Sequence, residues 1–372
     1  MAPVRVPEVM NGEAIHGPHL FDYVVKKGFG VKGLADTGLA ALPERYVHPP
    51  HERIDKDETI DGSPYLGPPI DLAALEEAGE EAAAAEQICG AARKLGFFQV
   101  VNHGVPLEVL EKAKRAAHRF FELSPEKKAV YLKGRGPCSN VFYGTSFSPE
   151  MEESLEWKDY LSMVYVGDDE AMAFWPPECR DAALEYLRSA RKMKRMILTT
   201  LVRGLGVEVE DFDSLISQYT EANAVNMNYY PICPSPELTV GVGRHSDLAA
   251  LTILLQDDIG GLYVKVEGQG WIDIPPVEGA LVINVGDTLE ILSNGCYKSA
   301  EHRVLASSTR PRVSVPIFVS PRPHTMIGPL KGLPEKDGKR VYRDLLFGEY
   351  MDNYFGAGHR GKTTLDFAKI SN

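Results

Sequence analysis

The chain has few of the features that mark a secreted, membrane-spanning or thiol-metal protein. Its five cysteines are odd in number and contain no Cys-x-x-Cys pair, so they indicate reduced thiols rather than a disulfide framework or a zinc site. No apolar run exceeds strand length, and the first 25 residues contain no signal-like segment. We therefore expect a cytoplasmic protein without a membrane span.

Positive charge is also in short supply. The 40 Lys and Arg residues are outnumbered by 52 Asp and Glu residues, which gives a formal net charge of −12. Nucleic acids and anionic membranes normally require a basic surface, so neither is expected as the main partner. The sequence favours a monomer whose partner is a small molecule, and an anionic ligand would need local basic groups.

Composition divides the 372 residues into four predicted regions. Residues 1–68 are rich in Pro, Gly and His, which predicts a leader that packs on the core, with a short helix near 20–27. Residues 69–215 carry helical patterns at 72–95, 106–123 and 182–204, and a strand at 97–101. Residues 216–325 switch to short β-branched and aromatic segments with jelly-roll spacing, at 225–230, 251–255, 262–266, 281–285 and 312–319. Residues 326–372 form a C-terminal helical extension.

A His-x-Asp pair lies within the predicted β region. His245 and Asp247 are two residues apart, and side chains at i and i+2 of an extended strand point to the same face. His302 follows 55 residues after Asp247, which is far enough to return from another strand. Two imidazoles and one carboxylate form the facial triad of non-haem iron(II) oxygenases, which leaves positions open for a co-substrate and oxygen.

An Arg-x-Ser pair follows ten residues after His302. Arg312 and Ser314 should point the same way from one strand, and an arginine fork suits a carboxylate. This arrangement fits a dicarboxylate co-substrate whose keto acid end chelates iron, with Tyr230 nearby as an aromatic donor. A lone His-x-Asp pair is more often structural, and the conjunction with His302, Arg312 and Ser314 favours the metal site.

The other candidate residues have simpler interpretations. His103 and His118 are more readily explained as structural histidines, and His16, His19, His48 and His51 lie in the leader, where a solvated surface is the default. The glycines of 268–270 predict a hairpin turn. A basic cluster at Lys127, Lys128, Lys133 and Arg135 is more typical of a solvated face than of a ligand contact.

These motifs resemble the plant 2-oxoglutarate-dependent dioxygenases of specialised metabolism over nearly the whole chain. The matching segments are GFFQVVNHGV at 96–105, NYYPICP at 228–234, VGVGRHSD at 240–247, LTILLQD at 251–257, GGL at 260–262, NVGD at 284–287, SAEHRV at 299–304 and RVS at 312–314. Within that family the chain is most similar to feruloyl-CoA ortho-hydroxylases. That similarity is carried by GVKGL at 30–34, GTSFSP at 144–149, LEWKDYLS at 155–162 and YRD at 342–344.

The resemblance implies a mixed α and β fold with a double-stranded β-helix (jelly-roll) core, a helical N-terminal region and a C-terminal helix. It implies iron(II) at His245, Asp247 and His302, with 2-oxoglutarate and oxygen as co-substrates and ascorbate as reductant. The implied residue roles are 2-oxoglutarate contacts from Asn228, Tyr230, Arg312 and Ser314, and substrate contacts from Phe318, Tyr160, Ser162 and Asn226. Phe318 could equally be a core residue.

Three functions follow from this sequence. The first is ortho-hydroxylation of a hydroxycinnamoyl-CoA thioester such as feruloyl-CoA. The second is the same chemistry on a free phenolic, flavonoid or indoleamine, which the charge of −12 favours because coenzyme A phosphates need a basic site such as Lys127 to Arg135. The third is an inactive barrel that binds a small molecule, against which the intact ligand set argues.

Overall fold

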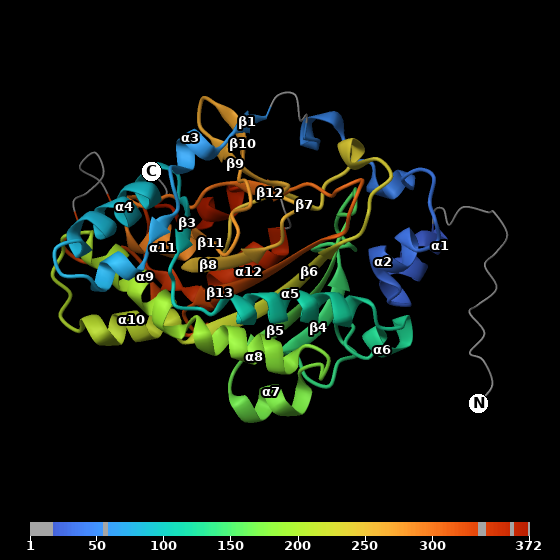
Figure 1. Ribbon diagram of the computed structural model, residues 1–372, viewed down its shortest axis with the longest axis horizontal. Coiled ribbons are helices and arrows are strands. Elements are labelled where there is room, and N and C mark those ends of the chain that lie inside the picture. Colours follow the sequence, from blue (N-terminus) through green and yellow to red (C-terminus); the bar gives the residue numbers. More distant parts are fainter. Residues whose placement is uncertain (1–17, 55–58, 334–339, 358–360, 371–372) are drawn as a thin grey trace.

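Two sheets face each other to form the core of the protein (Figure 1). The computed structural model describes residues 18–54, 59–333, 340–357 and 361–370. Within these residues the minor sheet has the strand order β1-β10-β9-β12-β7, and the major sheet has the order β2-β3-β11-β8-β13-β6-β5-β4. The jelly-roll core expected from strand spacing is confirmed. No helix in the described part is long and apolar enough to span a bilayer.

The strands are β1 (Ile60–Asp61), β2 (Ile70–Asp71), β3 (Phe97–Val101), β4 (Val141–Thr145), β5 (Asp159–Tyr165), β6 (Ala222–Tyr230), β7 (Val242–His245), β8 (Leu251–Gln256), β9 (Leu262–Val266), β10 (Gly270–Asp273), β11 (Leu281–Val285), β12 (His302–Val304), β13 (Arg312–Ser320), β14 (Met326–Ile327) and β15 (Leu345–Leu346). Neighbouring strands of the major sheet are antiparallel except for β2 and β3. The last two strands form a separate small ribbon.

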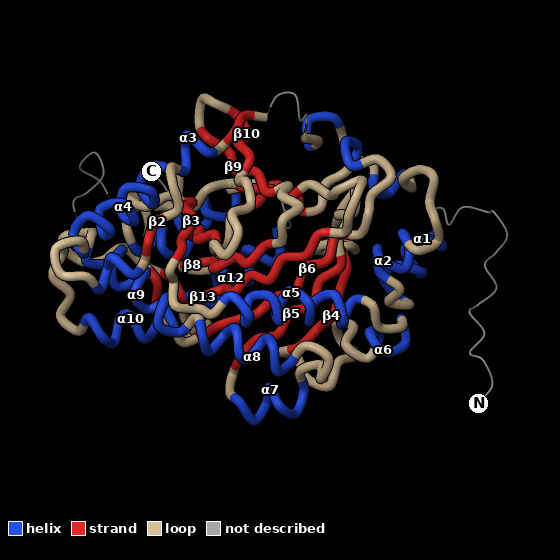
Figure 2. The backbone as a smooth tube through the Cα atoms, viewed as in Figure 1, coloured by secondary structure: helices blue, strands red, loops and turns tan. Residues whose placement is uncertain are grey.

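The longer helices are α4 (Glu81–Lys94), α5 (Leu107–Phe121), α8 (Arg180–Ser189), α9 (Arg191–Arg203), α10 (Phe212–Thr220) and α12 (Phe347–Ala357). The shorter α-helices are α1 (Pro18–Phe21), α2 (Gly30–Ala35), α3 (Ser63–Leu66), α6 (Pro125–Ala129), α7 (Asp168–Phe174) and α11 (Asp287–Leu292). Further helical turns are η1 (Asp22–Lys26), η2 (Glu44–Tyr46), η3 (Pro50–Glu52), η5 (Ala73–Glu76), η6 (Pro236–Leu238) and η7 (Thr363–Ala368). In Figure 2 most helices lie to the left of, below and to the right of the strands, and β9 and β10 lie at the upper edge.

Helix α5 shows why the major sheet has one covered face. It buries Val109, Leu110, Ala113, Ala117 and Phe120, a spacing of three or four residues that gives one apolar stripe, and it packs on β6 and β13. The strand residues that meet these helices are buried, whereas alternate residues of β6 are only partly buried. The partly buried residues face the space between the two sheets, so this inner face is available for a site.

Most of the predicted elements are confirmed, with differences at their ends. Strands β3, β9 and β11 have the predicted bounds, and the 268–270 segment turns between β9 and β10. The predicted helix at 72–95 is wrong in its first third, where η5 and a turn precede α4. The turn contains Gly79 at φ +97°, a backbone conformation that ends a helix. The predicted helix at 182–204 is two helices, α8 and α9, separated at Ala190.

The leader differs from expectation at one histidine. His48 is buried, and its Nε2 lies 3.1 Å from the carbonyl oxygen of Leu155, so the expected solvated surface is wrong there. Residues 48–54 lie over the outer face of the minor sheet, where Arg303 donates to the carbonyl of Arg53. His16 lies outside the described residues. The helix expected near 20–27 is confirmed by α1 and η1.

Two glycines provide an opposed pair of stability predictions. A Cβ at Gly96 would lie 1.9 Å from the carbonyl oxygen of Lys298, and Gly96 has φ +75°. Gly90 lies in α4, where a Cβ would meet no atom within 4 Å. We expect Gly96→Ala to lower the free energy of unfolding by roughly 2 kcal/mol or more. Gly90→Ala should raise it by about 1 kcal/mol. Urea unfolding followed by circular dichroism measures both, and shifts of the same sign would contradict the backbone argument.

Candidate metal and co-substrate site

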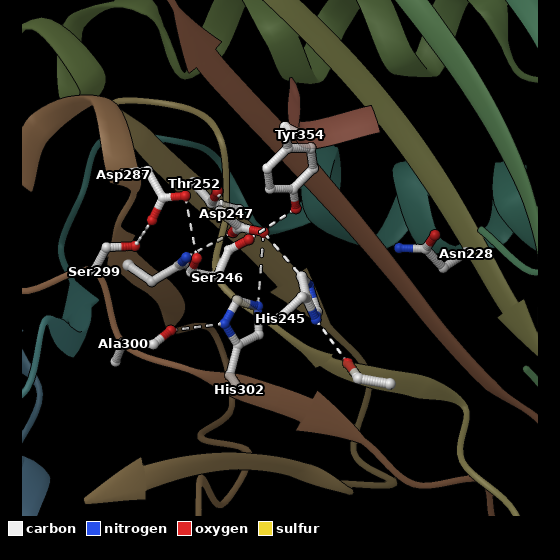
Figure 3. Close-up of polar contacts among 12 residues, drawn as sticks. Asn228, His245, Ser246, Asp247, Thr252, Asp287, Ser299, Ala300, His302 and Tyr354 are labelled. Atoms are coloured by element: carbon white, nitrogen blue, oxygen red, sulfur yellow. Dashed lines mark hydrogen bonds and ion pairs between the residues drawn. The ribbon is translucent and has the colours of Figure 1, made fainter. Parts of the chain in front are cut away.

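Three side chains from the predicted triad converge between the sheets. The ligand atoms of His245, Asp247 and His302 all lie within 4.8 Å of one another. His245 ends β7 and His302 begins β12, and the two residues are paired partners across these antiparallel strands. Asp247 Oδ1 lies 3.6 Å from His245 Nε2 and 3.7 Å from His302 Nε2. Figure 3 shows both imidazoles pointing toward the carboxylate.

The two imidazoles are oriented by backbone carbonyls. His245 Nδ1 lies 2.8 Å from the oxygen of Gly243, and His302 Nδ1 lies 3.1 Å from the oxygen of Ala300. A carbonyl can only accept, so each Nδ1 carries the proton and each Nε2 presents a lone pair to the centre. Burial and the neighbouring His245 lower the pKa of His302 to about 4. This keeps the imidazole neutral at pH 7, which is the form that binds a metal.

The two oxygens of Asp247 have different environments. Oδ2 accepts a hydrogen bond of 2.6 Å from Thr252 Oγ1 and another of 2.6 Å from Asn284 Nδ2. Oδ1 is the oxygen that faces the imidazoles. The donor set is therefore one carboxylate oxygen and two imidazole nitrogens on one side of a common centre, which suits a divalent iron ion with open positions.

A second buried carboxylate holds the loop that carries the ligands. Asp287 accepts from Ser246 Oγ at 3.1 Å, Ser299 Oγ at 2.7 Å and Tyr350 OH at 2.7 Å. Tyr354 OH donates to the carbonyl oxygen of Ser246 at 2.7 Å, a contact that Figure 3 shows directly above the metal-binding residues. These bonds connect α12 and α11 to the segment between the first two ligands. The pKa of Asp287 is raised to about 6, because the effect of burial outweighs the opposite effect of the hydrogen bonds from its hydroxyl donors.

Arg312 is a buried cation beside this site. Its side chain is 1% exposed, its Nε donates to the oxygen of Gly260 at 2.7 Å, and its Nη2 donates to Gln256 Oε1 at 3.1 Å. The guanidinium carbon lies 5.0 Å from the centre of the Tyr230 ring. Nη1 is buried and has no hydrogen-bond partner, and no carboxylate pairs with Arg312 among the described residues. A buried guanidinium of this kind requires an anion.

The remaining predicted co-substrate residues are neighbours of Arg312 in the sheet. Arg312 pairs with Tyr230, and Ser314 pairs with Asn228 across β13 and β6. Asn228 Nδ2 donates to Ser314 Oγ at 3.3 Å. Because paired residues in antiparallel strands share a face, the side chains at these positions line the inner side of the sheet.

The predicted substrate residues continue along the same strands. Tyr160 pairs with Asn228, and Ser162 pairs with Asn226. Phe318 pairs with Thr252, which donates to the metal-site carboxylate, so Phe318 lies close to the triad. Asn226 Oδ1 is buried without a hydrogen-bond partner. All four positions belong to the inner face, and Phe318 is partly exposed there rather than packed in the core.

The competing candidates have structural environments. His103 is buried, with Nε2 3.0 Å from the oxygen of Gly279 and Nδ1 accepting from the amide of Val105, so the structural interpretation is confirmed. His118 lies edge-on to Tyr229 in the helical layer. In the basic cluster, Lys128 is buried and its Nζ donates to the oxygen of Phe121, so the expected solvated face is wrong for this residue.

Sequence reasoning missed the residues that support the ligands. These are Thr252, Asn284, Asp287, Ser299, Tyr350 and Tyr354. For Thr252 and Asn284 a signal existed, because each is a polar residue within an apolar strand that interior packing would not favour. The tyrosines of α12 lie more than 100 residues from His245 and Asp247 in sequence, and no local pattern indicates their contacts.

Comparison with known proteins agrees with this geometry. The family model described as the 2OG-Fe(II) oxygenase superfamily matches residues 222–321. The model described as the N-terminal region of non-haem dioxygenases in morphine synthesis matches residues 68–178. A feruloyl CoA ortho-hydroxylase of Ipomoea batatas is 52% identical over 95% of this chain and 97% of its own. Scopoletin 8-hydroxylase of Arabidopsis thaliana is 51% identical over 94% of this chain and 97% of its own.

Solved structures show the same fold. The crystal structure of JOX2 in complex with 2OG, Fe and JA has a TM-score of 0.80 and 32% identity, and the match covers 92% of this chain and 97% of that chain. The dioxygenase for auxin oxidation from rice has a TM-score of 0.67 and 24% identity, and the match covers 82% of this chain and 99% of that chain. This likeness supports the fold alone. From its near-complete match to these relatives, the chain belongs to the 2-oxoglutarate- and iron(II)-dependent oxygenase superfamily and is an oxidoreductase that uses iron(II), 2-oxoglutarate and O₂.

Proposed function

We propose that this oxygenase hydroxylates the ring of feruloyl-CoA, or a related hydroxycinnamoyl-CoA, ortho to its side chain. The observation that carries the oxygenase chemistry is the convergence of two imidazoles and a carboxylate beside a buried arginine that has an unpaired N–H. The substrate is supported by relatives named as feruloyl CoA ortho-hydroxylases, which are 52% and 47% identical to this chain.

The proposed metal ligands are His245, Asp247 and His302. Bound iron, with 2-oxoglutarate and O₂, supplies the oxidising chemistry. The chain's contribution is to fix the donor atoms: the carbonyls of Gly243 and Ala300 hold each Nδ1 proton, and the donors to Asp247 Oδ2 leave Oδ1 for the metal.

The proposed 2-oxoglutarate contacts are Arg312, Ser314, Tyr230 and Asn228. The distal carboxylate would accept from Arg312 Nη1, the buried donor that lacks a partner, and Ser314 Oγ would add a second hydrogen bond. Tyr230 supports the guanidinium by lying under it at 5.0 Å. The charge of Arg312 is then compensated by the co-substrate rather than by a protein carboxylate.

The proposed substrate contacts are Phe318, Tyr160, Ser162 and Asn226. Phe318 can stack on an aromatic ring, and the unpartnered Asn226 Oδ1 can accept from a phenolic hydroxyl. Tyr160 and Ser162 offer further hydroxyl groups on β5. Together they would hold one ring carbon toward the metal site and exclude water from it.

A second candidate keeps the chemistry and changes the substrate to a free phenolic. It is favoured by the 51% identity to scopoletin 8-hydroxylase, which equals the identity to the bifunctional coumaroyl and feruloyl CoA ortho-hydroxylases of Ipomoea batatas. We further propose that the chain is divided into four regions, 1–68, 69–215, 216–325 and 326–372. We also propose that the protein is a cytoplasmic monomer that binds no nucleic acid, and that ascorbate is its reductant. The described cysteines are all free, which agrees with a reducing compartment.

Substrate identity is tested by succinate release over a panel. We expect succinate and hydroxylated product with feruloyl-CoA and coumaroyl-CoA, and little with free ferulate, flavanones, indoleamines or scopoletin. Product formation from scopoletin without turnover of either thioester would establish the second candidate instead. If no compound releases succinate and iron(II) with 2-oxoglutarate gives no visible charge-transfer band, the chain is an inactive binding barrel.

Loss of a ligand should abolish turnover while the fold remains. His245→Ala and Asp247→Ala each remove one proposed metal ligand, and the backbone pairing of β7 with β12 does not depend on either side chain. We expect iron retention and product formation to fall below detection, with an unchanged far-ultraviolet circular dichroism spectrum. His324→Ala, at an exposed histidine, is the matched control. Product formation by either ligand variant would rule out the assignment.

Arg312→Ala should raise the KM for 2-oxoglutarate steeply. Losing a charge-assisted contact to the distal carboxylate corresponds to roughly a tenfold to hundredfold rise. Arg310→Ala, two residues away at an exposed position paired with Asp258, should leave this KM unchanged. An unaltered 2-oxoglutarate requirement in the Arg312 variant would mean that another residue binds the distal carboxylate.

A further inference from the structure

A cavity lies outside the barrel, among the helices that cover the major sheet. Its volume is about 280 Å³, and we refer to it as the basic pocket. It is lined by Tyr165, Leu187, Arg188, Arg191, Lys194, Arg195, Thr220, Glu221 and Asn223. Its four cations come from the end of α8 and the first turns of α9, where spacings of three and four residues bring them to one side.

Positive charge in the basic pocket is only partly compensated. Lys194 is buried, and its Nζ donates to two neutral acceptors, the oxygen of Thr220 at 3.1 Å and Asn223 Oδ1 at 2.6 Å. Burial and the charge of Arg191 lower the pKa of Lys194 to about 8. Arg191 forms no ion pair within the described residues. The site is therefore electropositive in a chain of net charge −12.

The acidic side chains near the basic pocket form ion pairs at its edge. Arg188 pairs with Asp168 at 2.8 Å, and Arg195 pairs with Asp213 at 2.6 Å, in both cases with an exposed carboxylate. Glu221, the one acid among the lining residues, lies 3.0 Å from Arg322. Exposed pairs of this kind are weak, so these arginines can turn toward an anion in the pocket at small cost.

The basic pocket lies just beyond the strand ends that bound the barrel interior. Asn226 on the inner face of β6 is four residues from Ala222, the start of that strand, a distance of about 13 Å along the backbone. The inner positions between them are partly exposed, as are Phe318 and Ser320 on the paired β13. Glu221 and Asn223, at the same strand end, line the pocket. Asn223 is one of the helix-facing positions of β6, so the pocket and the inner face lie on opposite sides of the major sheet and adjoin at the strand ends.

We propose that the basic pocket binds the phosphate groups at the nucleotide end of an acyl-CoA thioester whose acyl end lies in the barrel. This rests on the function proposed above. Coenzyme A carries a diphosphate and a 3′-phosphate, joined to the thioester by a long flexible arm that can pass around the strand ends. Arginine forks bind phosphate oxygens in pairs, and Lys194 adds a point charge from the floor of the pocket.

The basic cluster singled out in the sequence is less suited to this role. Lys128 is buried and its Nζ donates to the oxygen of Phe121 beneath the Tyr143 ring, so it is not available to a ligand. Lys127, Lys133 and Arg135 are exposed and do not line the basic pocket. Arg135 is therefore a control residue of the same type outside the pocket.

The test compares feruloyl-CoA with its N-acetylcysteamine thioester, which lacks the nucleotide. For Arg191→Gln and Arg188→Gln we expect the KM for feruloyl-CoA to rise roughly tenfold with kcat unchanged, because only binding shared by ground and transition states is lost. The truncated thioester should show no change with either variant. Arg135→Gln should behave as wild type with both substrates.

Other results overturn the proposal. An unchanged KM for feruloyl-CoA in both pocket variants, an equal loss on both thioesters, or a rise with Arg135→Gln instead would each exclude phosphate binding in the basic pocket. If the wild-type enzyme turns over no thioester, the proposed substrate fails separately. Calorimetry of the iron-loaded enzyme with coenzyme A then decides the pocket, which stands only if Arg191→Gln weakens binding. Equal affinity for inorganic phosphate would show a general ion site, contrary to the nucleotide assignment.

Discussion

The site depends on the different roles of the two carboxylate oxygens of Asp247. A buried carboxylate is tolerated only when its lone pairs are satisfied, and here Thr252 and Asn284 take one oxygen and leave the other facing two imidazoles. The donors come from β8 and β11, adjacent strands of the major sheet, whereas the imidazoles come from the minor sheet. The carboxylate therefore ties the two sheets to a common centre.

The supporting network extends this constraint to the C-terminus. Asp287 receives hydroxyl bonds from residues on both sides of the ligand loop and from Tyr350 in α12, and Tyr354 reaches the carbonyl between the first two ligands. Helix α12 is thus part of the site's framework although it supplies no ligand. A metal centre whose geometry must hold open positions needs such second contacts, because the bare ligands would otherwise rotate toward one another.

The sequence predicted the features that depend only on residues close to one another in the chain. Alternation placed Arg312 with Ser314, because both lie in β13 and strand geometry fixes which side chains share a face. His245 and Asp247 also converge as predicted, although β7 ends at His245 and Asp247 follows in the loop. The sequence did not separate α8 from α9 at Ala190, since helix-forming residues continue through this position. Nor did it predict that His48 is buried or that Tyr354 reaches Ser246, because both contacts join segments more than 100 residues apart.

The substrate question has a different physical basis from the chemistry. Relatives at 51% identity include both a bifunctional coumaroyl and feruloyl CoA ortho-hydroxylase and a scopoletin 8-hydroxylase, so overall similarity does not distinguish a thioester from a free coumarin. The proposed substrate residues of the inner face would contact an aromatic ring in either case, and they carry no charge that separates the two substrates. The distinguishing group is the polyanionic nucleotide, whose phosphates need compensating positive charge when they leave water. Under the proposal made above, specificity for a thioester depends on the basic pocket, where Arg191 and Lys194 of α9 provide positive charge against the net charge of the chain.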